Sequence, residues 1–183
     1  ASAHAFAAVP ARIALERQRW ADAMALEARA PGWLAWDAYP AVEAMTEFAR
    51  ALGAARSQNS PRAREALDRL AALRDRAAES NAYWGTQVEI QRLGAAAWLT
   101  FEEGQRNEGL KTMRKAADLE ATTEKHPVTP GEVLPARELL ADMLLAMGEH
   151  AAAQEEYAAV LTRSPNRFNS LYGAGPAAEL RGD

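Results

Sequence analysis

The sequence predicts an all-α fold, an α-solenoid in which about four antiparallel helix pairs stack in series and one further helix closes the array. Ala153, Tyr157 and Pro165 follow Gly148 by five, nine and seventeen residues. This spacing is typical of a packed helical hairpin, because a small residue lets two helices approach, an aromatic fills the gap and a proline ends the second helix. The hydrophobic fraction is 49%, much of it alanine, which favours helices with thin cores between layers.

The first hairpin is predicted over residues 4–37, with its turn at 17–20 and a second helix that ends near Ala30. Pro10 lies inside an apolar stretch, so the first helix either kinks there or begins there. Residues 31–39 interrupt the pattern and are interpreted as an insertion, which a repeat array accommodates in a loop.

The second hairpin is predicted over residues 44–77. A polar segment forms its turn, with Ser60 as the N-cap and Pro61 at the first helical position. The flanking helices are expected to cover residues 40–55 and 61–79.

The third hairpin is predicted over residues 90–123, with its turn at Gly104 and apolar residues at helical spacing on both sides. Residues 122–128 form a second insertion. The fourth hairpin, residues 134–167, turns at Gly148, and a closing helix follows over residues 166–181.

The loop before the fourth hairpin contains two prolines and His126. Residues 129–132 read Thr-Pro-Gly-Glu, which resembles a capping box with proline at the first helical position. Pro135 would then lie in the early turns of that helix. The loop is either a rigid finger that presents His126 to a partner or a device that stops one helix and starts the next.

These positions make the chain resemble the tetratricopeptide-repeat (TPR) family over nearly its whole length, most specifically in residues 134–167. Residues 124–131, 134–138 and 164–168 resemble segments of bacterial TPR proteins without an assigned activity. The resemblance implies a right-handed superhelix and a non-catalytic scaffold whose concave face binds a peptide or protein. Those proteins are generally longer at the N-terminus and often carry an export signal, so this single-domain chain of residues 1–183 is expected to be a fragment. The competing fold is a helical bundle around one common core.

In stacked hairpins the first helix of each pair lines the concave side, and the repeat positions select a set of candidate binding residues. These are Arg12, Met45, Phe48, Leu52, Arg56, Gln91, Trp98, Glu102, Glu138 and Asp142, with Tyr172 on the closing helix. The lysines and asparagines by which some TPR proteins clamp a terminal carboxylate are replaced here by apolar groups and acids. This pattern favours an apolar segment that carries a basic residue.

Trp98 is the residue by which this interpretation can be tested. If it is exposed on the concave face, Trp98→Ala weakens partner capture and leaves helicity nearly intact. The alternative is that Trp98 packs against the preceding hairpin, in which case fold and binding are lost together.

Charge and composition argue against other functions. The net charge of −4, with basic residues interspersed among acids, argues against a nucleic-acid partner. The chain has no cysteine for disulfides or thiolate metal sites, and no apolar run long enough for membrane insertion. Its compartment, cytoplasmic or periplasmic, is left open.

Catalysis is not expected. The three histidines are far apart and no pair has metal-ligand spacing. The adjacent carboxylates Glu102 and Glu103 point away from each other on a helix, as do Glu155 and Glu156. We therefore expect no enzyme activity, no cofactor and no metal. The alternative to a binding scaffold is a structural or regulatory spacer, or a self-association module, within a larger protein for which export is one of the options left open.

Overall fold

The computed structural model describes residues 2–124 and 132–181, and these residues form nine α-helices and one short 3-10 helix with no strand. The predicted all-α class is therefore confirmed. The helices are α1 (Ser2–Glu16), α2 (Trp20–Met24), η1 (Trp36–Ala38), α3 (Pro40–Arg56), α4 (Ser60–Ser80), α5 (Ala82–Glu102), α6 (Arg106–Ala121), α7 (Ala136–Met147), α8 (His150–Arg163) and α9 (Phe168–Arg181).

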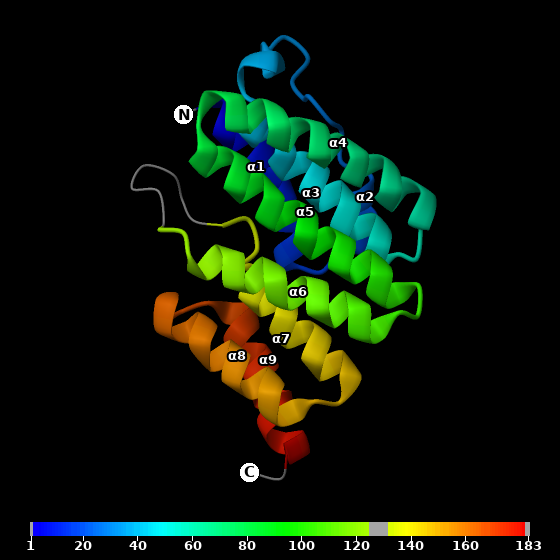
Figure 1. The fold of residues 1–183 in the computed structure, drawn as a ribbon, viewed down its shortest axis with the longest axis vertical. Helices are drawn as coiled ribbons and strands as arrows, with labels where there is room; N and C mark the ends of the chain where they lie inside the picture. Colours follow the sequence, from blue (N-terminus) through cyan, green and yellow to red (C-terminus); the bar gives the residue numbers. More distant parts are fainter. Residues whose placement is uncertain (1, 125–131, 182–183) are drawn as a thin grey trace.

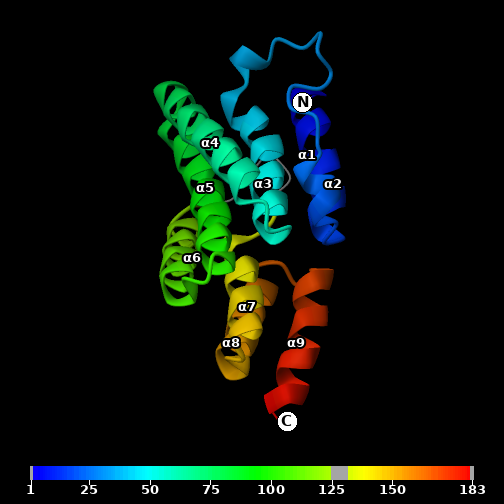
Figure 2. The same cartoon turned by 90° about the vertical axis from the view of Figure 1, so that its right-hand side faces the viewer.

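Helices α1 to α5 lie side by side in the upper half of the molecule, and α6 to α9 continue below them to the C-terminus, so the two termini lie towards opposite ends (Figure 1). Each helix packs against the next one in sequence, and the odd-numbered helices also contact each other in order, α1 with α3, α3 with α5, α5 with α7 and α7 with α9. Figure 2 shows α3 between α1 and α2 on one side and α4 and α5 on the other.

Four turns share one backbone geometry. Each has a residue in the left-handed conformation, namely Gln18, Gln58, Gly104 or Gly148. In every case the N–H of the following residue donates to the carbonyl five residues before it: Arg19 to Ala14 (2.8 Å), Asn59 to Ala54 (2.8 Å), Gln105 to Thr100 (3.1 Å) and Glu149 to Leu144 (3.0 Å). This is the Schellman arrangement, which satisfies the carbonyls at a helix end. The turns lie where the sequence predicts them.

Small residues allow the helices to approach closely. At Gly53 in α3, an added Cβ would lie 2.6 Å from the backbone nitrogen of Met24 in α2. At Gly109 in α6, it would lie 2.8 Å from the carbonyl oxygen of Ala97 in α5. Several alanines of α3 and α5 are also fully buried. The backbones of neighbouring helices therefore approach each other closely between layers, as the alanine-rich composition predicts.

Some predicted boundaries are wrong. α2 ends at Met24 rather than near Ala30, and the chain continues as a loop to η1. α5 begins at Ala82, well before the start predicted for the third hairpin, because Asn81 ends α4 and its side chain accepts a hydrogen bond from the N–H of Tyr83 at 2.8 Å. Pro10 lies inside α1, so the first helix does not begin at this residue.

Two predicted helix caps also differ. Asn59, not Ser60, caps α4, and its side-chain oxygen accepts from the N–H of Arg62 at 3.3 Å. α7 begins at Ala136, so Pro135 precedes the helix instead of lying within it. Residues 129–131 of the expected capping box lie outside the described residues.

The N-terminus of α7 is capped from another helix. Both carboxylate oxygens of Glu120, in α6, accept from the N–H of Ala136, at 2.9 and 3.0 Å. Glu120 is 6% exposed, and its burial raises the pKa of the carboxyl to about 7, although hydrogen bonds from the backbone of Ala136 and Arg137 lower it. A tertiary contact replaces the local cap here.

Candidate functional site

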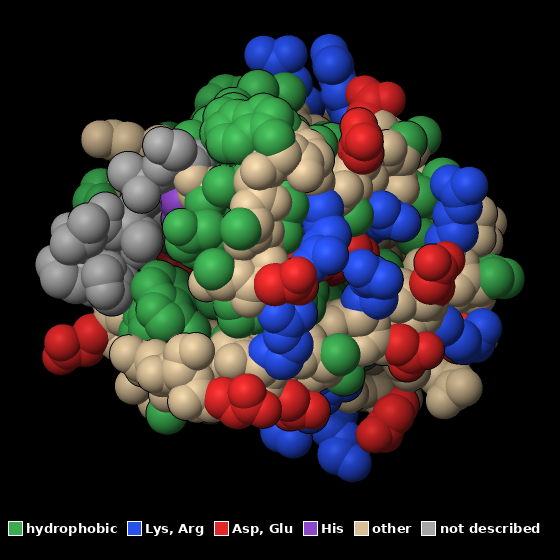
Figure 3. Space-filling view, turned by 90° about the horizontal axis from the view of Figure 1, so that it is seen from above, with side chains coloured by type: hydrophobic (Ala, Val, Ile, Leu, Met, Phe, Trp, Pro, Cys, Tyr) green, Lys and Arg blue, Asp and Glu red, His purple; other side chains and the backbone are tan. Residues whose placement is uncertain are grey.

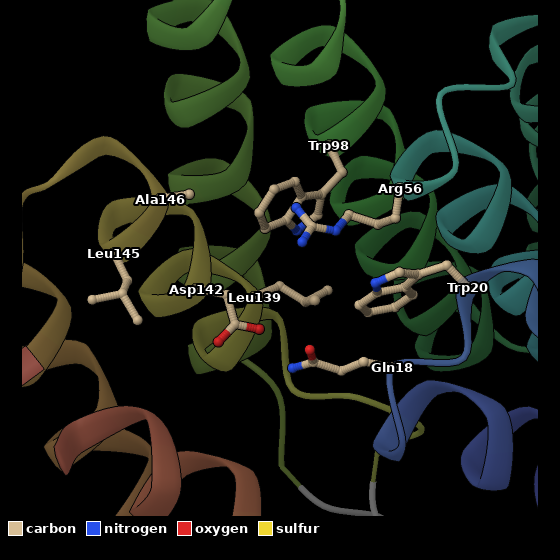
Figure 4. Close-up of a pocket in the computed structure, with 8 residues that line it drawn as sticks. All are labelled: Gln18, Trp20, Arg56, Trp98, Leu139, Asp142, Leu145 and Ala146. Atoms are coloured by element: carbon tan, nitrogen blue, oxygen red, sulfur yellow. The ribbon is translucent and has the colours of Figure 1, made fainter. Parts of the chain in front are cut away.

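One polar groove between the helices brings together residues from α2, α3, α5 and α7 (Figure 4). Its volume is about 250 Å³. The lining residues are Gln18, Trp20, Arg56, Trp98, Leu139, Asp142, Leu145 and Ala146. The repeat positions select three of these residues as candidates: Arg56, Trp98 and Asp142. The fold therefore brings together three predicted residues from three different hairpins.

Arg56 ends α3 and places its guanidinium against two tryptophans. The guanidinium carbon lies 3.9 Å from the ring centroid of Trp98 and 5.2 Å from that of Trp20. Nη1 also donates to Oε1 of Glu102 at 3.1 Å. Burial lowers the pKa of Arg56, and the nearby Glu102 opposes that shift. The charge of Arg56 is therefore balanced by one carboxylate and two aromatic faces.

Asp142 approaches the groove from α7, on the opposite wall (Figure 4). The hydroxyl of Tyr157, in α8, donates to Oδ1 of Asp142 at 2.6 Å. Burial raises the pKa of Asp142 to about 6, and the nearby Glu138 also raises it, whereas the bond from Tyr157 lowers it. Arg56 and Arg167 lower this pKa from a distance, but among the described residues neither forms an ion pair with Asp142.

Phe48 and Leu52 were predicted to face the concave side, and the structure contradicts this. Both are buried, at 1% and 0% exposure, as is Met45 at 8%. Helices α1 and α2 cover α3 on the side away from α4 and α5, so these positions point into a layer contact instead of an open surface.

Trp98 is 1% exposed and packs edge-on against Phe101, with ring centroids 5.3 Å apart. It contributes a wall of the groove, but most of its surface is buried. This environment agrees with the second alternative from the sequence, in which Trp98 packs within the array.

Glu138 is also buried, at 1% exposure, and it serves a structural contact. Arg167, before α9, donates two hydrogen bonds to its carboxylate, at 2.6 and 2.7 Å, and the hydroxyl of Ser170 donates a third. Arg167 also pairs with Glu16 at the end of α1, at 2.9 Å. This cluster joins α7 and α9 to the first hairpin, so Glu138 is not available to a ligand.

The remaining candidates lie elsewhere. Gln91 is half-buried and lines a separate pocket of about 20 Å³. Arg12 donates to the carbonyl oxygen of Glu132 at 3.0 Å. Tyr172 is 71% exposed and lines a second, more open groove between α9 and the turn after α1. Glu102 reaches the main groove only through Arg56. His126 lies outside the described residues.

Five lining residues were not predicted: Gln18, Trp20, Leu139, Leu145 and Ala146. Leu139 follows the apolar spacing of its helix, and that spacing alone does not distinguish a groove wall from the core. Trp20 carried a usable signal, because a tryptophan directly after a hairpin turn lies at the turn end of its helix pair, where a large side chain can extend beyond the packed helices.

Comparison of the chain with family models, with curated proteins and with solved structures gives no match. In the described part of the chain, no cluster of three or more acidic or histidine side chains has the geometry to hold a metal ion. None of the helices described combines the length and the apolar character needed to cross a bilayer.

Proposed function

We propose that the chain is a TPR-like α-solenoid, a right-handed array of helix pairs that acts as a non-catalytic scaffold and holds a peptide or a protein segment in its groove. Two features of the fold support this. The odd-numbered helices contact one another in order, as the first helices of stacked hairpins do, and four turns repeat one geometry. A solenoid of this kind leaves an extended surface on which partners bind.

The observation that carries the proposal is the groove itself. It is open to solvent, and it combines apolar walls from Leu139, Leu145 and Ala146 with the half-buried Trp20 and the carboxylate of Asp142. Sites that bind peptides commonly pair an aromatic or apolar floor with a few polar groups that fix orientation.

Selection of random peptides displayed on phage tests this function, with the full chain as bait. Ala146 is exposed at the rim of the groove, so Ala146→Trp fills it without disturbing the core. We expect the selected peptides to bind the wild type and to lose at least tenfold in affinity for this variant. Ala159, exposed on α8 outside the groove, provides the matched control Ala159→Trp. Equal losses in both variants, or no enrichment of peptides, would refute the proposal.

A second function, self-association, is supported by exposed apolar side chains on the first helix, α1, and on the last, α9. On α1 the exposed residues Phe6, Val9 and Ile13 share one face, and Trp33 packs against Phe6 with ring centroids 5.8 Å apart. Figure 3 shows hydrophobic side chains gathered on part of the end that carries the loop after α2. Exposed apolar patches often mark contacts between proteins.

Light scattering distinguishes the two functions. A self-association module has a mass that rises with concentration in the absence of any ligand, and Val9→Asp keeps it monomeric. A binding scaffold has the mass of one chain at all concentrations.

A further inference from the structure

The groove holds one acidic group, Asp142, that forms no ion pair with another described residue. Arg56 already pairs with Glu102 and lies over two tryptophan rings. Asp142 has a hydrogen bond from a neutral hydroxyl to Oδ1, and no ion pair to it is found among the described residues. The acid nearest to it on α7, Glu138, is paired with Arg167. Because Arg56 is paired with Glu102 and Arg167 with Glu138, the carboxylate of Asp142 gives the groove a net negative charge.

The groove also has the size of a side chain. Its volume of about 250 Å³ is smaller than the roughly 300–1,000 Å³ of sites that hold drug-sized molecules. Apolar side chains at one end, from Leu139 and Leu145, adjoin the carboxylate, so the methylene stem of a long side chain and its charged end would each meet a suitable surface. Trp20 is half-buried at the groove and offers an apolar surface to the residues on either side of the basic one.

We propose that the groove recognises a basic side chain, arginine or lysine, within an otherwise apolar peptide segment, and that Asp142 is the residue that selects it. The proposal rests on the proposed function of the groove as a peptide site. The cation lies against the Oδ2 side of Asp142, the stem against Leu139 and Leu145, and the apolar neighbours against Trp20. An acidic residue is disfavoured, because Arg56 already has its carboxylate partner.

Three capped pentapeptides test the preference. They differ only in the central residue, which is arginine, its neutral isostere citrulline or glutamate, and have alanine and leucine on either side. Each is titrated into the full ¹⁵N-labelled chain, and the indole N–H resonance of Trp20 is followed, its assignment made from Trp20→Phe. We expect the arginine peptide to bind at least about tenfold more tightly than the citrulline peptide, a difference of about 1.4 kcal/mol.

Asp142→Asn should remove the difference between these two peptides, since the amide keeps an acceptor for Tyr157 but loses the charge. Asp68→Asn is the matched control, on the exposed face of α4, and should leave the preference unchanged. Thermal unfolding shows whether both variants keep the fold, and the comparison of arginine with citrulline in the wild type needs no variant.

The outcomes separate this proposal from the function on which it rests. Equal binding of the arginine and citrulline peptides, or tightest binding of the glutamate peptide, overturns the basic preference and leaves a peptide site in place. No shift of Trp20 with any pentapeptide also overturns the preference if display-selected peptides still bind in the groove. If those peptides fail as well, the proposed function is wrong.

Discussion

The buried carboxylate of Glu120 predicts an unusual pH dependence of stability. Burial raises the pKa of this group from an ordinary value of 4.5 to about 7 in the folded chain. A raised pKa means that the folded state holds its proton more tightly than the unfolded state does. The stabilisation is therefore complete below the unfolded pKa and is lost as the pH rises through the folded value. Between pH 5 and pH 8 the loss amounts to about 2–3 kcal/mol of unfolding free energy.

The assay is urea unfolding followed by circular dichroism at pH 5 and pH 8, for the wild type and for Glu120→Gln. The glutamine keeps an acceptor for the N–H of Ala136 but does not ionise. We expect the wild type to lose about 2–3 kcal/mol more than this variant between the two pH values. Glu155→Gln, at an exposed position on α8, should follow the wild type. Parallel pH profiles for Glu120→Gln and the wild type would refute the reasoning, because other titrating groups cancel in the comparison.

Three further substitutions test the packing by urea or thermal unfolding. Gln58 is exposed and has φ of 58°, so Gln58→Gly should stabilise the chain by about 0.5–1 kcal/mol, and a loss of stability would contradict the turn geometry. An added Cβ at Gly173 would lie 2.6 Å from the hydroxyl oxygen of Tyr157, whereas Gly175 has open space around it. Gly173→Ala should therefore cost about 1–3 kcal/mol of unfolding free energy, and Gly175→Ala should not destabilise the chain. Equal effects of the two substitutions would contradict the α8–α9 contact. Trp98→Ala should cost about 3–5 kcal/mol, since the ring is buried, and near-wild-type stability would show that it is not core.

The turns were predictable because their chemistry is local. Gly104 and Gly148 supply the left-handed residue that ends a helix, and small residues follow each of them at fixed offsets. Gln18 and Gln58 take the same conformation without glycine, and the repeat spacing located them. The N-cap of α4 was predicted as Ser60 but is Asn59, because asparagine and serine cap helices equally well and the sequence does not distinguish two adjacent candidates.

The site was predicted only in part, because exposure depends on how the layers pack. Phe48 and Leu52 have the right helical spacing for a concave face, but neighbouring helices cover α3 on both sides. Arg56, at the end of α3, and Asp142, in the middle of α7, are only partly buried and line the groove. The cap that Glu120 provides to α7 joins residues sixteen apart in sequence, and no local pattern reveals it.

The central claim is that a peptide binds in the groove between α2, α3, α5 and α7. Photo-cross-linking of a display-selected peptide that carries a diazirine at its central residue, followed by mass spectrometry, tests it most directly. The account predicts cross-links to Trp20, Leu145 and their neighbours around Asp142. Cross-links confined to the exposed faces of α1 or α9 would contradict it.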